Sequence, residues 1–396
     1  MSMHGIKYYS FLEPSGYGLA ALGYLNALLD LECPIHWLPL ILGEQGYHPW
    51  YQSKSAKLSV EKILHECLSE DDQVARLIAC LEPIDDYKTI VMHTVPEYWP
   101  YLKEADKHLV GYTVWETSRL PKHFPELINQ LDRVLVPASF NKPIFASSGV
   151  DIPIHVVPHI LNSVAAQTDD RIIAMRSLLE VPADNYLFYS INTWTNRKSL
   201  WTLVHAYLSS FTIDDDVSLV LKTSDRGPRH ASDDSEHDTQ ILVSEIVAQY
   251  PRPAHVRVIN HKISNDEIAA LHQLGDCFVS ASHSEGWGLG MFEAAGVGNS
   301  VVAIGWGGHL DFLPQQLAYL TNYELTPVLV TLGQASYSQD QRWATADPQE
   351  LSIQLKKVFA QPDIARQKGQ QLAEQLQQNY NSKKVGQQLY KAIYAN

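Results

Sequence analysis

Glu285 and Glu293 stand eight positions apart, on either side of a glycine-rich turn with the sequence GWGLG at residues 286–290. The apolar stretch 277–281 comes just before this turn and favours a buried parallel strand. Residues 289–295 after it are mostly good helix formers. The sequence therefore predicts a strand, a glycine turn and a helix, with one carboxylate in the turn and the other about one helical turn further on.

The start of this predicted helix is suited to binding phosphate. The first turn of a helix leaves N–H groups unpaired at its positive end, and glycine lets an anion approach the backbone. Carboxylates accept hydrogen bonds from hydroxyl groups instead, so the pattern suits a diphosphate between two sugars, as in a nucleotide-sugar. The turn residues that we expect to bind such a donor are Gly286, Trp287, Gly288, Leu289 and Gly290. The alternative is an ordinary turn with a solvated Glu285 and a capping Glu293.

This stretch resembles the E-x7-E signature of the retaining glycosyltransferases of family 4. The resemblance rests on the two glutamates, the aromatic residue in the turn, the sequence EAAG at residues 293–296 and the pair Gly307-Gly308 after the next apolar stretch. It implies the GT-B fold, with two Rossmann-like, doubly wound α/β domains that face each other across a cleft, and a C-terminal helix that crosses back to the first domain. It also implies that Glu293 binds ribose hydroxyls and that Glu285, as a catalytic residue, holds the transferred sugar.

Cations are expected beside this turn to bind the diphosphate. The family usually has an arginine after an earlier strand and a lysine six residues later. Lys198 matches that lysine and is a predicted catalytic residue, whereas Asn192 occupies the position of the arginine. Arg197 and Lys222 are both candidates to replace the arginine, and the choice between them stays open. A lysine near a helix start is disfavoured by the helix dipole, so a bound anion explains Lys198 better than a surface position.

Two strand ends in the first half carry further candidates. The sequence SGYG at residues 15–18 resembles the glycine loop of family 4, which lines the donor phosphate and the acceptor, so Gly16 and Gly18 are predicted to bind the donor and Tyr17 the acceptor. His93 ends another predicted strand. A catalytic role and a structural role are both open for this histidine.

The remaining candidates lie in loops. Residues 112–121 resemble a segment of some bacterial family 4 enzymes, in which Trp115 would stack on a sugar and Glu116 and Arg119 would meet acceptor hydroxyls. An ion pair between Glu116 and Arg119 is the alternative. Ile263 lies in a loop before a predicted helix, and in relatives this loop holds the nucleotide base through its backbone, so we place Ile263 with the donor site.

The chain has 396 residues, 45% of them hydrophobic and 19% charged, which suits a globular protein of two domains. We expect domains at residues 1–165, joined by about 380–396, and at residues 166–379. Strand-like and helical stretches alternate in both, which predicts parallel sheets, and residues 348–396 contain three helical stretches. The stretch 162–183 between the two sets is less regular. The predicted strands are residues 6–11, 35–40, 89–93, 109–115, 133–137 and 154–157, then 186–191, 217–222, 256–260, 277–281 and 300–304.

Composition excludes several classes of function. The net charge is −14 and acidic residues outnumber basic ones in both halves, which argues against nucleic-acid binding. The four cysteines are scattered without CxxC pairs, and the run Asp214-Asp215-Asp216 reads as a solvated turn, so we expect no metal and no cofactor. No apolar stretch is long enough for a membrane span and no signal-peptide core is present. We expect a cytoplasmic protein, with peripheral contact at the inner face of the membrane left open.

These observations predict an enzyme that moves a sugar, retaining its configuration, from a nucleotide-sugar to a hydroxyl of a glycan or lipid-linked saccharide, as in cell-surface polysaccharide synthesis. Fixed positive charge would stabilise the departing diphosphate without a metal. The alternatives are a nucleotide-sugar epimerase or sugar phosphorylase of the same fold, and a non-catalytic relative that binds nucleotide-sugars. The sequence does not give the donor sugar, the base, the acceptor or the oligomeric state.

Overall fold

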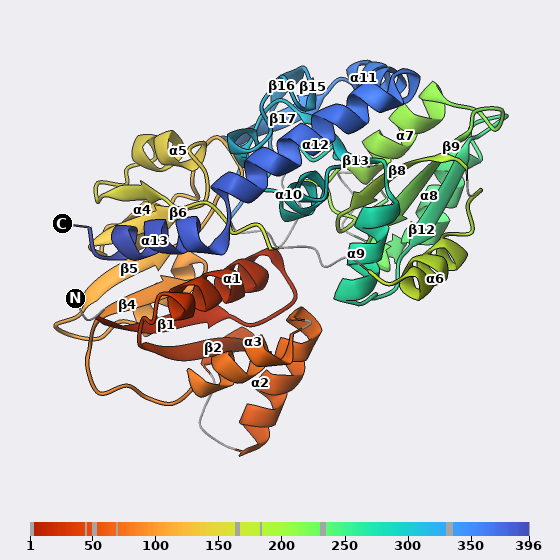
Figure 1. Ribbon diagram of the computed structural model, residues 1–396. Coiled ribbons are helices and arrows are strands. Elements are labelled where there is room, and N and C mark those ends of the chain that lie inside the picture. Colours follow the sequence, from red (N-terminus) through yellow and green to blue (C-terminus); the bar gives the residue numbers. More distant parts are fainter. Residues whose placement is uncertain are drawn as a thin grey trace. The chain divides into compact units, whose positions relative to one another are not determined.

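The computed structural model of the chain describes residues 4–43, 46–49, 54–68, 70–162, 167–182, 184–229, 235–329 and 336–395. The chain forms two compact units, each with a sheet and flanking helices (Figure 1). The first unit comprises Met1–Trp115, Leu120–Asn162 and Gln378–Asn396, and the second comprises Glu116–Arg119 and Ser163–Gln377. The domain boundary that the sequence predicts at residue 165 lies outside the described residues.

The first unit is built on a seven-stranded sheet with the order β3-β2-β1-β4-β5-β6-β7. Its strands are β1 (Gly5–Phe11), β2 (Ile35–Gly43), β3 (Gly46–Pro49), β4 (Tyr87–His93), β5 (His108–Tyr112), β6 (Arg133–Val136) and β7 (Ile154–Val156). All neighbours pair in parallel except β2 and β3. The strand order reverses at β1 and β4, which lie side by side although they are far apart in the sequence. Polar residues that follow these two strands therefore meet at one edge of the sheet.

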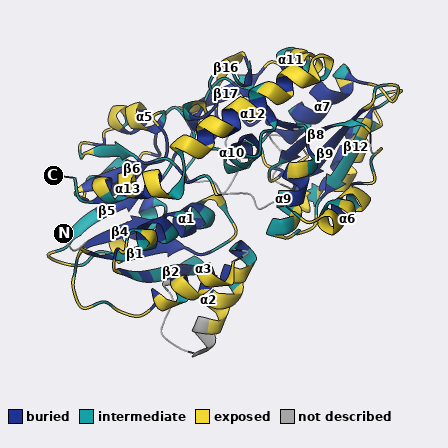
Figure 2. Cartoon of the chain, viewed as in Figure 1, coloured by how far each residue is buried: buried dark blue, intermediate teal, exposed yellow. Residues whose placement is uncertain are grey.

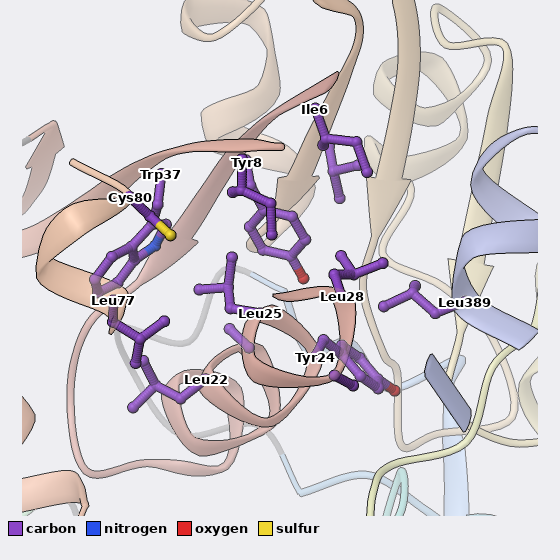
Figure 3. Packing of buried hydrophobic residues seen from close by; sticks show 14 of the residues in the cluster. Ile6, Tyr8, Leu22, Tyr24, Leu25, Leu28, Trp37, Leu77, Cys80 and Leu389 are labelled. Carbon is purple, nitrogen blue, oxygen red and sulfur yellow. The ribbon is translucent and has the colours of Figure 1, made fainter. Parts of the chain in front are cut away.

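Helices cover this sheet, and one of them comes from the end of the chain. The helices are α1 (Gly16–Asp30), α2 (Lys54–Cys67), α3 (Asp71–Ala79), η1 (Pro96–Tyr101), α4 (Phe124–Ile128), α5 (Asn141–Ser147) and α13 (Ser382–Ile393). Figure 3 shows Leu25 and Leu28 of α1 in the core with Tyr8 of β1 and Leu389 of α13. A Cβ atom on Gly386 would lie 3.0 Å from Cβ of Ala27, so α13 packs closely against α1. The last helix thus returns to the first unit, as predicted.

The second unit contains a six-stranded, all-parallel sheet with the order β12-β9-β8-β13-β14-β15. Its strands are β8 (Tyr186–Ile191), β9 (Val217–Lys222), β12 (His255–Ile259), β13 (Cys277–Val279), β14 (Ser300–Ile304) and β15 (Tyr319–Thr321). Two small antiparallel pairs are added, β10 (Arg226–Gly227) with β11 (His237–Asp238), and β16 (Tyr323–Pro327) with β17 (Arg342–Ala346). Here the strand order reverses at β8 and β13.

The helices of the second unit are α6 (Asp169–Leu179), α7 (Leu200–Ser210), α8 (Thr239–Val247), α9 (Asn265–Leu274), α10 (Leu289–Gly296), η2 (Gly308–Asp311), α11 (Pro348–Ala360) and α12 (Pro362–Asn379). Polar side chains cap several of them: Asp238 begins α8, and Ser264 with Glu267 forms a capping box at α9. In both units most strands of the main sheet are largely buried and the helices keep an exposed outer face (Figure 2). The structure therefore confirms two Rossmann-like, doubly wound sheets.

Two predictions about local structure have different outcomes. The stretch 162–183 was expected to be irregular, but it contains α6, in which only Met175 and Leu179 are buried. Its weak apolar pattern gave little helical signal, so this expectation was wrong. The run Asp214-Asp215-Asp216 does form a turn before β9, in which Asp215 accepts a hydrogen bond from the backbone N–H of Thr212 and Asp214 pairs with Arg252.

Candidate active site

The point where the strand order of the second sheet reverses brings two predicted segments together. β8 and β13 are neighbours, and the chain leaves them toward Arg197 and Lys198 on one side and Glu285 on the other. In doubly wound sheets, ligands bind outside the carboxyl ends of strands at such a reversal. The fold alone therefore marks this edge of the sheet as a binding site.

Glu285 is the centre of a buried ion-pair cluster at this edge. Glu285 is only 5% exposed. Lys198 Nζ donates a hydrogen bond of 2.6 Å to Glu285 Oε1, and Ser282 Oγ donates another of 2.6 Å to the same oxygen. Arg197 Nη1 lies 3.3 Å from Glu285 Oε2. The structure thus brings together Lys198, Arg197 and Glu285, which the sequence placed in one site.

The cations keep this carboxylate ionised. Burial by itself would raise the pKa of Glu285, but the charges of Lys198 and Arg197 and the hydrogen bonds from Lys198 and Ser282 lower this pKa to about 2. The carboxylate is therefore an acceptor only. Its Oε1 accepts from Lys198 and Ser282 and its Oε2 from Arg197, so Oε2 keeps capacity to accept from a ligand hydroxyl.

Arg197 connects the cluster to a second carboxylate. Its Nη1 donates a hydrogen bond of 2.6 Å to the carbonyl oxygen of Ser284, and its Nη2 lies 3.5 Å from Glu116 Oε1. Tyr337 also shares a side-chain hydrogen bond with Arg197. Glu116 was predicted either to bind the acceptor or to pair with Arg119. The structure pairs Glu116 with Arg197, while Arg119 is exposed, and the contact of Glu116 with the acceptor stays a prediction.

Two cations and two carboxylates make this cluster neutral. Arg197 and Lys198 are balanced by Glu116 and Glu285, and each side chain has less than a quarter of its surface exposed. Charges are costly to bury unless they are paired. The positive charges of Arg197 and Lys198 are already held in place. An anionic ligand could therefore pair with these cations in place of a carboxylate.

The glycine turn begins α10 as the sequence predicts. Gly288 is the N-cap residue with a φ of 92°, a conformation that favours glycine, and a Cβ atom there would lie 2.5 Å from Met291 Cε. Because this N-cap residue is glycine, it has no side chain of its own to cap the first turn of the eight-residue helix. Trp287 is buried against Phe292 and Phe312, so it anchors the turn. The amides at the start of α10 are therefore available to an anion.

The other donor-site candidates in the second unit lie nearby in the fold. Asn192 donates a hydrogen bond of 3.0 Å to Ser190 Oγ, and its backbone N–H bonds to the carbonyl oxygen of Lys222. Lys222 Nζ donates to the carbonyl oxygen of Thr223, and burial lowers the pKa of this lysine. Ile263 is half-buried in the loop between β12 and α9. Of the two candidates to replace the missing arginine, Arg197 is the one that shares the ion-pair cluster with Lys198.

Glu293 lies on α10, one turn beyond the cap, with 28% of its side chain exposed. This exposure leaves the carboxylate accessible to a ligand, as the predicted contact with ribose hydroxyls requires. His272 lies beside it, with 3.7 Å between Glu293 Oε2 and His272 Nε2. No pattern in the sequence connects these two residues.

The candidates in the first unit lie at the corresponding edge of its sheet, in a different environment. Gly16 is the first residue of α1, and a Cβ atom on Gly18 would lie 2.0 Å from the carbonyl oxygen of Glu13, so the turn needs glycine at that position. The hydroxyl of Tyr17 bonds to Thr113 Oγ1 at 2.9 Å. Trp115 is 7% exposed and packs on Phe124, which leaves little of its ring for a sugar.

His93 is enclosed among tyrosines at the end of β4. It is 1% exposed, and its Nδ1 lies 2.9 Å from the hydroxyl of Tyr8. Burial lowers the pKa of His93 well below its usual value, and His159 adds to this effect. The histidine is therefore neutral at physiological pH and forms part of a packed polar network, which is the structural role that the sequence left open beside catalysis.

Sequence reasoning missed Ser282 and Tyr337, which complete the cluster around Glu285 and Arg197. Ser282 lies three residues before Glu285, where a small polar residue after a strand is common and gives little signal. Tyr337 is distant in the sequence and follows no recognisable motif.

Within the described ranges, no group of three or more His, Cys, Asp or Glu side chains gathers closely enough to hold a metal ion. A search of the described residues found no helix with both the length and the apolar character that crossing a membrane requires.

The model of a family described as "Family 4 Glycosyltransferase in conflict systems" matches residues 226–389, which include the glycine turn and both glutamates. No curated protein matches the chain in sequence. Among solved structures, HepE from Anabaena in complex with UDP-glucose has a TM-score of 0.67 at 14% identity, covering 99% of this chain and 100% of its own.

Two further structures show the same fold. A glycosyltransferase from Rickettsia africae has a TM-score of 0.69 at 14% identity and covers 100% of both chains. Sucrose-phosphate synthase from Thermosynechococcus elongatus has a TM-score of 0.66 at 16% identity and covers 99% of both chains. At such low identity these likenesses show the fold of the whole chain and not its substrates. The chain therefore has the GT-B fold over its whole length, and its residues 226–389 match the model of a family 4 glycosyltransferase.

Proposed function

We propose that the protein is a retaining, metal-independent glycosyltransferase that moves a sugar from a nucleoside diphosphate sugar to a hydroxyl group of an acceptor. The observation that carries this proposal is the neutral ion-pair cluster of Lys198, Arg197, Glu285 and Glu116 beside the start of α10, where the N-cap residue is Gly288. It offers fixed cations and backbone amides to a diphosphate at the edge of the sheet where doubly wound folds bind their ligands.

The charges suit the chemical demand of the reaction. As the bond to the sugar breaks, negative charge builds on the departing diphosphate, and preorganised donors that meet this charge lower the barrier. Lys198 and the amides of residues 288–290 would meet the diphosphate. Once the diphosphate shares Lys198 and Arg197, the oxygens of Glu285 become available to accept hydrogen bonds from the transferred sugar.

The proposed donor is a UDP-sugar. HepE, which shares the fold, has been solved with UDP and with UDP-glucose, and this supports UDP as the first nucleotide to test. In our proposal Glu293 accepts hydrogen bonds from the ribose, and the loop around Ile263 holds the base. The proposed acceptor is a glycan or lipid-linked saccharide made in the cytoplasm, with peripheral contact at the membrane; resemblance to family 4 supports this part.

The proposal is tested by measuring the thermal midpoint of the protein with each of a panel of nucleoside diphosphates and nucleotide-sugars. A ligand that binds the folded state raises this midpoint by mass action. We expect a UDP-sugar to raise it and UDP to be released when an acceptor glycan is added. Binding without release would support the non-catalytic alternative, release with inorganic phosphate alone would support a phosphorylase, and no binding at all would contradict the proposal.

A further inference from the structure

A chain of buried polar groups runs behind Glu293. Asn299 Nδ2 donates a hydrogen bond of 2.7 Å to the hydroxyl of Tyr189, and that hydroxyl lies 2.8 Å from His272 Nδ1. Tyr189 and His272 are 0% and 1% exposed. His272 then faces Glu293, with 3.7 Å between Nε2 and Oε2. The four residues come from β8, α9, α10 and the turn after α10, so they are distant in sequence but meet in one place.

These hydrogen bonds lead us to assign the proton of the histidine. The Tyr189 hydroxyl accepts from the amide of Asn299, and we assign its own proton to His272 Nδ1, which lies within hydrogen-bonding distance. A neutral imidazole that accepts at Nδ1 carries its hydrogen on Nε2. His272 Nε2 therefore presents an N–H group toward the carboxylate of Glu293.

This N–H group is buried and has no hydrogen-bond partner among the described residues. An unsatisfied buried donor is costly, and a hydrogen bond to a carboxylate would relieve that cost. At 3.7 Å the carboxylate is just outside hydrogen-bonding range, and a normal N–H to O distance is about 2.9 Å. A movement of the Glu293 side chain of roughly 1 Å would close this gap.

The histidine itself is held in place, so the glutamate is the partner that moves. A Cβ atom on Gly275 would lie 2.3 Å from Tyr189 Cε1, which shows how tightly the tyrosine is packed behind the histidine. The ring of Phe278 lies nearly parallel to that of His272, at 24° and 6.5 Å between centroids. Asn299 Nδ2 also donates a hydrogen bond of 2.7 Å to the carbonyl oxygen of His272.

We propose that His272 is a positioning residue for nucleotide binding: its Nε2–H group holds one oxygen of Glu293, so that the other oxygen faces the ribose hydroxyls of the bound nucleotide. Tyr189 and Asn299 set the tautomer that makes this contact. The inference rests on the proposed function, because it deepens the role of Glu293 at the nucleotide site.

The test uses two variants that separate the two nitrogens of the histidine. In His272→Gln, the amide nitrogen falls near the place of Nε2 and can still reach Glu293. In His272→Asn, the shorter amide falls near the place of Nδ1 and can bond to Tyr189 but not to Glu293. A purely structural role toward Tyr189 would be rescued by asparagine, whereas positioning of Glu293 is rescued by glutamine.

The measurement is calorimetric affinity of the full-length protein for UDP and for 2′,3′-dideoxy-UDP, which lacks the ribose hydroxyls. We expect His272→Asn to weaken UDP binding about tenfold, the scale of one hydrogen bond to a charged group, and His272→Gln to weaken it less than threefold. For the dideoxy nucleotide both variants should bind like the wild type. In a Glu293→Ala background, His272→Asn should have no further effect, because the two residues act through one contact.

A control comes from a second histidine–tyrosine pair in the same unit. His205 Nδ1 lies 3.0 Å from the hydroxyl of Tyr250, and His205→Asn should leave UDP affinity unchanged. Equal losses for UDP and the dideoxy nucleotide, rescue by asparagine instead of glutamine, or full additivity with Glu293→Ala would each overturn the proposal for His272. If the wild type binds no UDP, or binds both nucleotides equally, the proposed contact of Glu293 with the ribose is contradicted. The proposal for His272 is then contradicted as well, because it depends on that contact.

Discussion

The two sheets reverse their strand order in the same way but place opposite kinds of polar groups at the reversal. In the first unit, the buried polar groups beside β1 and β4 are neutral: Tyr24 bonds to the hydroxyl of Tyr112 at 2.6 Å, and Tyr8 bonds to His93. In the second unit, β8 and β13 lead to Lys198 and Glu285, which are charged and paired. The same topology therefore supports a closed neutral network in one unit and an ionic cluster in the other.

This difference indicates at which of the two edges a bound ligand can replace a hydrogen bond or ion pair of the protein. The hydroxyl of Tyr24 is shared by the backbone carbonyl groups of Val157 and Pro158, so the neutral network is satisfied internally and holds the loop after β7. A carboxylate that pairs with fixed cations, by contrast, has the same charge as a phosphate and can share its donors with one. The ionic edge is thus the better candidate for the diphosphate, and the neutral edge is the better candidate for structural support.

Replacement of Lys198 should have the largest effect. Because Lys198 would meet the charge that grows on the departing diphosphate, Lys198→Ala should reduce turnover by about 10²–10³, while donor affinity falls by a smaller factor. Lys368→Ala is the matched control, since the ammonium group of Lys368 lies over the ring of Tyr319, 5.0 Å from its centroid, and takes no part in the cluster. Turnover and calorimetric donor affinity measured together would check this. If Lys198→Ala lowered turnover and donor affinity by equal factors, Lys198 would bind the ground state and the transition state equally well.

The acid stability of the ionic edge provides the second test. The pKa of Glu285 is lowered from 4.5 to about 2 in the folded protein, so its ion pairs contribute stability above pH 4.5 that is lost as the pH falls toward 2. The size of that contribution is about 3 kcal/mol. Glu285→Gln should therefore be less stable than the wild type at pH 7, and the difference should shrink between pH 5 and pH 2. The thermal midpoints of both proteins, measured across this pH range, test this prediction. A difference in midpoint that does not change with pH would show that the charge of Glu285 does not stabilise the cluster.

The neutral edge should respond to substitution in stability and not in nucleotide binding. Tyr24→Phe removes a buried hydroxyl that bonds to Tyr112 and two backbone carbonyl groups, and should lower the free energy of unfolding by about 1–2 kcal/mol. UDP affinity should stay at the wild-type value. A large loss of UDP affinity with an unchanged thermal midpoint would contradict the structural role of the neutral edge and would place UDP there.

The smallest expected effect is that of metal removal. The cluster supplies its positive charge from Lys198, Arg197 and the start of α10, so dialysis against EDTA should leave turnover unchanged. Loss of turnover that magnesium or manganese restores would show that these groups are insufficient for the diphosphate.

The fold was largely predictable because both sets of strands are strongly apolar and are separated by helical stretches. The strands at 217–222 and 300–304 match β9 and β14 at both ends. The strand expected at 109–115 ends at Tyr112, since the next residues leave the sheet. α6 escaped prediction because it buries only two residues and so lacks a clear amphipathic period.

The ionic site was partly predictable for a different reason. Lys198 and Glu285 follow strands that become neighbours, and charged residues at such positions are visible in the sequence. The contact of Glu116 with Arg197 and that of His272 with Glu293 join residues from separate elements. Such contacts depend on the packing of helices and loops, which no local pattern encodes.

The most direct test of the account is a crystal structure of the protein with UDP. We expect the diphosphate at the start of α10, within hydrogen-bonding distance of Lys198 Nζ and the amides of residues 288–290, with the ribose hydroxyls on Glu293. A diphosphate bound at the carboxyl edge of the first sheet, or away from Lys198, would contradict the assignment of the ionic edge as the donor site.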